Sequence, residues 1–160
     1  EIAQCLVGSE MCIRDRLSTD PKYLILDEPT ANFDPDFKQD FLNVIMQFME
    51  SGKKSVIIAS HILDELDRIA DYLIYLDKGE LVYSGDIESF RDKYRILSGE
   101  SYKVKLLKQE DIIHAEDRKY GTKALVVNHG YSKYDGALTV TVPTLEEFMY
   151  HYSKRGESVL

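Results

Sequence analysis

The sequence predicts an α/β fold with a mostly parallel sheet, because strand and helix patterns alternate along its first half. Tyr23–Leu26 is a short apolar run followed by two acids, which is typical of a buried strand. Ser55–Ala59 is a second strand, rich in β-branched residues. Between them, Asp34–Pro35 predicts a helix start, with Asp as N-cap and Pro at N1, and Ser51–Gly52 predicts its end.

A short helix and an antiparallel edge hairpin are expected next. Asp64–Ala70 has a helical pattern, and the strand-like runs Tyr72–Leu76 and Leu81–Ser84 flank the turn sequence DKGE. Asp86 is then the expected cap of a helix that extends to about Tyr94.

The character of the sequence changes after Gly99, and the remainder predicts a small α+β extension. Three runs have strand character: Tyr102–Leu107, Ala124–Asn128 and Ala137–Val142. Gly130 and Gly136 bracket an expected turn. Pro143–Tyr152 predicts a closing helix with Pro at N1.

Composition narrows the classes of function. The 160 residues carry a formal net charge of −8 with a pI near 5.0, which disfavours a long track along a nucleic acid backbone. No apolar run approaches the roughly 20 residues that span a bilayer. Any membrane association is therefore expected to come through a partner. The only cysteines are Cys5 and Cys12, so the rest of the chain suits a reducing compartment.

Two acids carry the chemistry that the sequence predicts. Asp27 and Glu28 follow a buried strand, and the carboxyl ends of parallel strands are where ligands bind in open sheets. Phosphoryl chemistry fits this pair: Asp27 would hold Mg²⁺ directly or through water, and Glu28 would activate the attacking water. The alternative is that both are turn or N-cap acids.

The surrounding motifs resemble the ABC ATPase family. LILDEPT at Leu24–Thr30 is similar to its Walker B segment, ANFDP at Ala31–Pro35 to its D-loop, and Ser60–His61 to its switch histidine (H-loop). LDKGELVYSGD at Leu76–Asp86 matches its usual edge hairpin. The resemblance is strong from about Leu17 to Gly85 and implies a P-loop NTPase fold that binds ATP and Mg²⁺.

The resemblance also implies roles for individual residues. Glu28 matches the catalytic base, Asp27 the Mg²⁺-supporting aspartate, and His61, with Ser60 before it, the γ-phosphate contact. Asp34 matches the aspartate that links two sites across a dimer, although it also suits a plain helix N-cap. The sequence gives no such setting to three other histidines, which we expect to be ordinary surface or core residues: His114, His129 and His151.

Other parts of an ATP site are missing from these 160 residues. No GxxxxGK[ST] phosphate cradle (Walker A), glutamine loop or LSGGQ-like signature occurs. Where the signature is expected, Leu6–Arg16 reads LVGSEMCIRDR, which resembles a translated sequencing-adapter frame. A divergent signature helix is the alternative. We therefore expect three regions: a non-native segment at 1–16, a partial nucleotide-binding domain at 17–97 and the α+β extension at 98–160.

These observations predict the truncated C-terminal part of an ABC transporter's ATP-hydrolysing subunit, inactive as this chain alone. The resemblance implies a second ATPase subunit and transmembrane permease subunits as partners, no nucleic acid, and a cytoplasmic place on the inner face of the membrane. PTLEEFMYHYSKRGE at Pro143–Glu157 resembles the tail of ABC-2-type exporters. The alternatives are a soluble ABC-type ATPase acting on nucleic acid or ribosomes, and a non-catalytic ABC-like fragment.

Overall fold

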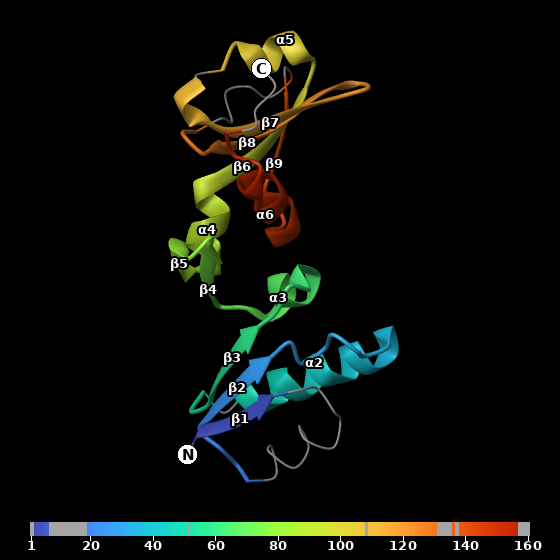
Figure 1. Ribbon diagram of the computed structural model, residues 1–160, viewed down its shortest axis with the longest axis vertical. Helices are drawn as coiled ribbons and strands as arrows, with labels where there is room; N and C mark the ends of the chain where they lie inside the picture. The colour runs from blue at the N-terminus through green and yellow to red at the C-terminus, as the bar shows by residue number, and fades with distance from the viewer. Residues whose placement is uncertain are drawn as a thin grey trace. The chain divides into compact units, whose positions relative to one another are not determined.

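The chain is mixed α/β and divides into two compact units, residues 1–69 and 70–160 (Figure 1). The computed structural model describes residues 2–6, 19–50, 52–107, 109–130, 136 and 138–156. The domain boundaries that we expect between residues 16 and 17, and between residues 97 and 98, stay predictions. The mixed α/β class that the sequence predicts is confirmed.

The first unit contains a three-stranded parallel sheet with the order β1-β2-β3. Its strands are β1 (Ile2–Leu6), β2 (Tyr23–Asp27) and β3 (Ser55–Ala59). The register pairs Asp27 with Ala59, so β2 and β3 end at the same edge. β2 and β3 confirm the predicted strands, whereas β1 was not predicted. From residue 7 onward, the predicted non-native segment lies outside the described residues.

Helix α2 (Pro35–Met49) covers one face of this sheet, as Figure 1 shows. Asp34 caps it, since its Oδ1 accepts a hydrogen bond of 2.9 Å from the Phe37 amide, and Pro35 opens its first turn. The core formed with β2 contains residues that are at most 4% exposed: Leu24, Leu26, Phe41, Leu42 and Ile45. Of the predicted Ser51–Gly52 stop, Ser51 lies outside the described residues, and Gly52 has a φ of 65°.

Helix α3 (Leu63–Ile69) follows β3 and packs loosely. None of its residues is buried, although Ile69 contacts the α2 core. Arg68 Nη1 donates to Gln39 Oε1 of α2 at 3.0 Å. Polar contacts therefore contribute much of its attachment.

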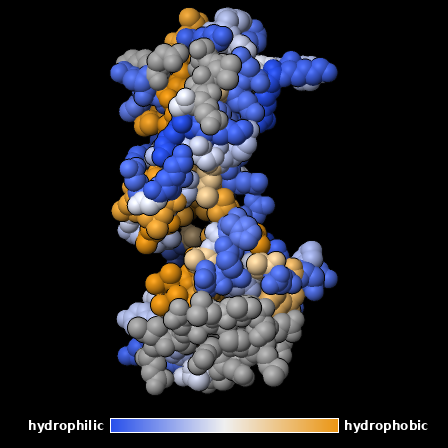
Figure 2. Space-filling model, viewed as in Figure 1, coloured by the Kyte–Doolittle hydropathy of each residue, from blue (hydrophilic) through white to orange (hydrophobic). Residues whose placement is uncertain are grey.

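The second unit begins with an antiparallel hairpin, as predicted, but this hairpin is not an edge of the parallel sheet. Strands β4 (Tyr72–Asp77) and β5 (Glu80–Asp86) form a two-stranded sheet of their own. The two-residue turn, Lys78–Gly79, has φ values of 50° and 81°, which suits a tight hairpin turn. Figure 2 shows apolar side chains gathered over this hairpin. The exposed ones are Tyr72, Ile74, Leu76 and Leu81.

A four-stranded antiparallel sheet forms the rest of the second unit, with the order β7-β8-β6-β9. Helix α4 (Ile87–Lys93) is capped by Asp86, as predicted, and leads directly into β6. The strands are β6 (Tyr94–Gly99), β7 (Ile112–Arg118), β8 (Gly121–Val127) and β9 (Thr139–Thr141). β8 and β9 overlap the last two predicted strands, whereas β6 and β7 were not predicted. The predicted turn between Gly130 and Gly136 falls largely on 131–135, outside the described residues.

The predicted strand Tyr102–Leu107 is wrong. Helix α5 (Ser101–Lys105) occupies most of that run, and a 3₁₀ helix, η1 (Gln109–Asp111), follows. Val104 and Leu107, three residues apart, are buried, whereas Leu106 is exposed. Burial therefore follows the helical spacing and overrides the alternation of Tyr-Lys-Val-Lys.

The closing helix α6 (Leu145–Ser153) starts later than predicted. Thr144 is its N-cap in a capping box with Glu147, so Pro143 precedes the cap and does not occupy N1. Phe148 is fully buried and its ring contacts four other rings: Tyr75, Phe90, Tyr94 and Tyr152. No helix in the described part of the chain has the length and apolarity to cross a membrane.

Candidate functional site

The predicted acids and the predicted histidine meet at one edge of the parallel sheet. Glu28 directly follows β2, and Ser60 and His61 directly follow β3. Because β2 and β3 are parallel neighbours in register, their carboxyl ends bring these residues together. The Glu28 amide donates to the carbonyl of Ala59 at 2.8 Å, which extends the pairing by one residue.

Glu28 is the acceptor at the centre of this site. Its Oε1 accepts from the His61 amide at 3.1 Å, and its Oε2 lies 2.7 Å from His61 Nδ1. Ser60 Oγ donates more weakly to Oε2 at 3.4 Å, and also accepts from the Ile62 amide at 3.0 Å. The φ of Glu28 is +46°, a left-handed conformation that costs a non-glycine residue about 1–2 kcal/mol. Strain of this kind is characteristic of functional sites.

The charge state of Glu28 follows from these contacts. Partial burial raises the pKa of the carboxyl, but the hydrogen bonds and charge of His61, aided by Ser60, outweigh it and hold the pKa below its ordinary value. Glu28 is therefore a carboxylate at neutral pH. The side chains of Glu28 and His61 are 41% and 73% exposed, so solvent screens this pair and it contributes little stability.

Asp27 and Asp34 have different settings. Asp27 ends β2 with an exposed side chain beside Glu28, and one such carboxylate suits Mg²⁺, which is bound by one or two carboxylates together with phosphates and waters. Asp34 acts as the N-cap of α2. Among the described residues, no three His, Cys, Asp or Glu side chains form a ready metal site.

A second link across the site was not predicted. Thr30, which is 2% exposed, donates its hydroxyl to Glu65 Oε2 at 2.7 Å. Glu65 Oε1 also lies 3.3 Å from Lys38 Nζ of α2. Glu65 differs from its exposed neighbour Asp64, since its side chain is only 13% exposed. Its place in the first turn of α3, four residues after His61, is the signal that could have revealed it.

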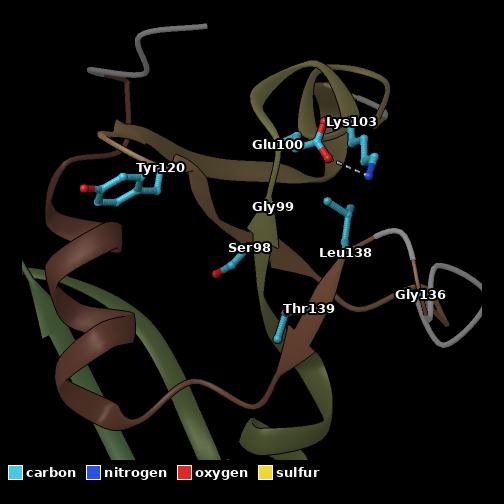
Figure 3. A pocket seen from close by; sticks show the side chains of 8 residues that line it. All are labelled: Ser98, Gly99, Glu100, Lys103, Tyr120, Gly136, Leu138 and Thr139. Carbon is cyan, nitrogen blue, oxygen red and sulfur yellow. Dashed lines mark hydrogen bonds and ion pairs between the residues drawn. The ribbon is translucent and has the colours of Figure 1, made fainter.

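The second unit holds an open pocket of about 360 Å³, shown in Figure 3. Eight residues line it: Ser98, Gly99, Glu100, Lys103, Tyr120, Gly136, Leu138 and Thr139. Its cation, Lys103 Nζ, is already paired with Glu100 Oε1 at 3.1 Å. None of the predicted site residues lines this pocket.

Two of the remaining histidines form a buried pair in the second unit. The Nδ1 atoms of His114 on β7 and His151 on α6 are 2.8 Å apart, and the residues are 4% and 1% exposed. One imidazole must donate and the other accept, so the contact needs at least one neutral ring. His129, in contrast, is exposed and lies 3.3 Å from Asp111 Oδ1. The prediction of ordinary core or surface histidines did not anticipate the pairing.

Comparisons with known proteins find relatives for about half of the chain. A putative ABC transporter ATP-binding protein of Mycoplasma pneumoniae is 42% identical over 69 residues, 43% of this chain and 21% of the relative. The energy-coupling factor transporter ATP-binding protein EcfA2 of Caldanaerobacter subterraneus is 41% identical over 81 residues, 50% of this chain and 28% of the relative. About half of the chain is similar in sequence to ABC transporter ATP-binding proteins. EcfA2 of Streptococcus pyogenes is 35% identical over 83 residues, again 50% of this chain and 29% of the relative.

The chain thus spans less than a third of the length of these ABC relatives. No family model matches the chain. A solved structure, the ADP conformation of an ATP-binding cassette of an ABC transporter, is 27% identical and covers 49% of this chain and 30% of its own, with a TM-score of 0.43. The recognition of an ABC ATPase segment from LILDEPT and its neighbouring motifs is confirmed by the sequence relatives.

Proposed function

We propose that this chain supplies the water-activating part of the ATP-hydrolysing subunit of an ABC transporter. The contact between Glu28 and His61 at the shared edge of β2 and β3 is the observation that carries the proposal. The names of the relatives, all of them transporter ATP-binding proteins, support the transport role.

Each site residue has a proposed task. Glu28, ionised at neutral pH, accepts the proton of the water that attacks the γ-phosphate of ATP. His61, with its exposed imidazole, donates to a γ-phosphate oxygen, and Ser60 supports this nucleotide contact. Asp27 would hold Mg²⁺ directly or through water, and the ion, when bound, would neutralise phosphate charge. Asp34 caps α2 and contributes to contacts with a second ATPase subunit.

Glu28 and His61 must exchange their mutual contact for contacts with substrate before either acts. Their pair is exposed and screened, so the exchange costs little free energy. The left-handed Glu28 backbone and the hydrogen bond from its amide to the Ala59 carbonyl keep the carboxylate at the sheet edge during the exchange. The backbone of the site is therefore arranged before nucleotide binds, and only the side-chain contacts change.

The partners follow from this role. We propose transmembrane permease subunits and a second ATPase subunit, with the protein on the cytoplasmic face of the membrane. Export is proposed from the likeness of Pro143–Glu157 to exporter tails. The names of the relatives do not state a direction of transport.

Phosphate release from ATP tests the proposal. The 160 residues contain no GxxxxGK[ST], so the purified chain alone is expected to show no measurable hydrolysis. Uninterrupted DNA reads around these codons give the gene region as it is encoded. The protein expressed from that region is expected to hydrolyse ATP. There, Glu28→Gln should lower kcat by roughly 10²–10⁴-fold.

The matched control is Glu50→Gln, the same change at an exposed glutamate at the end of α2. It should leave kcat within about twofold. Hydrolysis by the 160-residue chain that Glu28→Gln abolishes would contradict the need for a cradle. An unchanged kcat in the Glu28→Gln variant of the longer protein would contradict the assignment of the base.

A further inference from the structure

The segment after β2 and the segment after β3 are joined at two levels. The outer link is the contact of Glu28 with His61, and the inner link is the hydrogen bond from Thr30 to Glu65. Thr30 lies two residues after Glu28, and Glu65 lies four residues after His61, in the first turn of α3. The two links therefore hold the same pair of segments against each other.

The inner link is shielded from water and the outer link is not. Thr30 is 2% exposed and the Glu65 side chain 13%, whereas the side chains of the outer pair are 41% and 73% exposed. A hydrogen bond to a shielded carboxylate is stronger and geometrically stricter than a solvent-exposed ion pair. The inner link is therefore the one able to fix the geometry.

Glu65 also ties in helix α2. Its second oxygen, Oε1, lies 3.3 Å from Lys38 Nζ, in the first turns of α2 just after the Asp34 cap. The bond from Arg68 to Gln39 adds a second α2–α3 contact one turn further along. One carboxylate of α3 thus contacts two other segments: the turn after β2 and α2.

We propose that Glu65 is a positioning residue that, through Thr30 and Lys38, holds His61 against Glu28. Glu65 and Thr30 do not touch the reacting atoms in this arrangement. The catalytic meaning of the positioning rests on the proposed function. The positioning itself is a property of the folded chain and can be measured without nucleotide.

The backbone amide of His61 reports on the outer contact, because it donates to Glu28 Oε1 at 3.1 Å. Its hydrogen exchange is measured by NMR in the 160-residue chain. Thr30→Val removes the inner donor without changing charge, and exchange of the His61 amide should accelerate about tenfold. Thr30→Ser keeps the hydroxyl and should restore the wild-type exchange rate.

Glu65→Gln tests the second partner. It weakens the hydrogen bond from Thr30 and the contact with Lys38, so exchange of the His61 amide should again accelerate about tenfold. Asp64→Asn is the matched control, because it removes the same charge from an exposed neighbour on the same helix. It should leave the exchange rate close to that of the wild type.

If Thr30→Val does not fold, Glu65→Gln decides alone. A His61 exchange rate that stays at the wild-type value in Thr30→Val, or that is equal in Glu65→Gln and Asp64→Asn, overturns the proposal. Failed ATP hydrolysis by the longer protein would overturn the proposed function and leave this result standing.

Discussion

Acidification should destabilise the second unit through the buried histidine pair. His151 is 1% exposed, so its protonation in the folded chain would bury a positive charge, which costs free energy. Burial lowers its pKa most, and the positive charge of a protonated His114, of Lys123 and of Arg118 adds to the effect, while Glu116 opposes it. The pKa of His151 falls from 6.5 to about 4.

The direction and size of the effect follow by linkage. The unfolded chain binds this proton more tightly than the folded chain, so stability is fully present above about pH 6.5 and is lost as pH falls toward about 4. One pKa unit corresponds to about 1.4 kcal/mol, so the free energy of unfolding should fall by at most about 3 kcal/mol over this window. Below about pH 4, this group contributes no further loss.

Charged and titratable groups surround the pair, and the carboxylates among them also affect stability at low pH. Those that interact with it or with its neighbours come from β7, β8 and α6: Glu116, Arg118, Lys123, Glu147, Tyr150 and Lys154. Glu147 pairs with Lys123, and this pairing outweighs its burial and holds its pKa below the ordinary value. Carboxylates of this kind also lose stability at low pH. Only a difference between variants isolates the histidine.

Urea unfolding of the full chain at about pH 7, 5.5 and 4.5 measures that difference. His151→Gln keeps a hydrogen-bonding amide but cannot titrate, so the advantage of the wild type over it should shrink by roughly 2–3 kcal/mol between the first and last pH. His129→Gln removes an exposed histidine from the same unit and should follow the wild type. Parallel loss of stability in wild type and His151→Gln would refute the reasoning.

Two further substitutions test local geometry. Asp34→Ala removes the cap of α2 and should lower the free energy of unfolding by about 1 kcal/mol, whereas Asp34→Asn should lower it by less than half of that, as measured in urea. Gly121→Ala should be severely destabilising, by about 3 kcal/mol or more, because its Cβ would lie 2.2 Å from the Gly99 carbonyl oxygen at a φ of 129°. Gly130→Ala, where φ is 79° and space is open, is the control and should cost about 1 kcal/mol in thermal unfolding. Equal losses at the two glycines would contradict the clash.

The elements that sequence predicted well are those in which several signals agree. For α2, the Asp34 cap, Pro35 and the apolar spacing all indicate the same helix start. Tyr94–Gly99 shows the opposite case: it follows α4 without a turn residue, so nothing in the local pattern separates helix from strand. At α5 the alternating pattern was genuine, but packing of Val104 and Leu107 selected a helix.

The contacts of the candidate site were also predictable only in part. Glu28 and His61 were predictable because each directly follows a strand, and parallel neighbours share an edge. The hydrogen bond from Thr30 to Glu65 was not, because Glu65 lies on α3, beyond the end of β3, where no strand register places it beside Thr30. A glutamate on a short charged helix looks like any solvated residue until the fold places a buried hydroxyl beside it.

The difference between the exposed pair and the shielded hydrogen bond indicates which contacts hold the site together. Charges that meet substrate must stay accessible, and accessible ion pairs are too weak to fix their own geometry. The alignment of Glu28 with His61 must therefore come from elsewhere: the paired ends of β2 and β3, the left-handed Glu28 backbone, and the shielded Glu65 carboxylate. Because the last of these joins α3 to the turn after β2 and to α2, its loss should disturb the exposed pair while the sheet and its core survive.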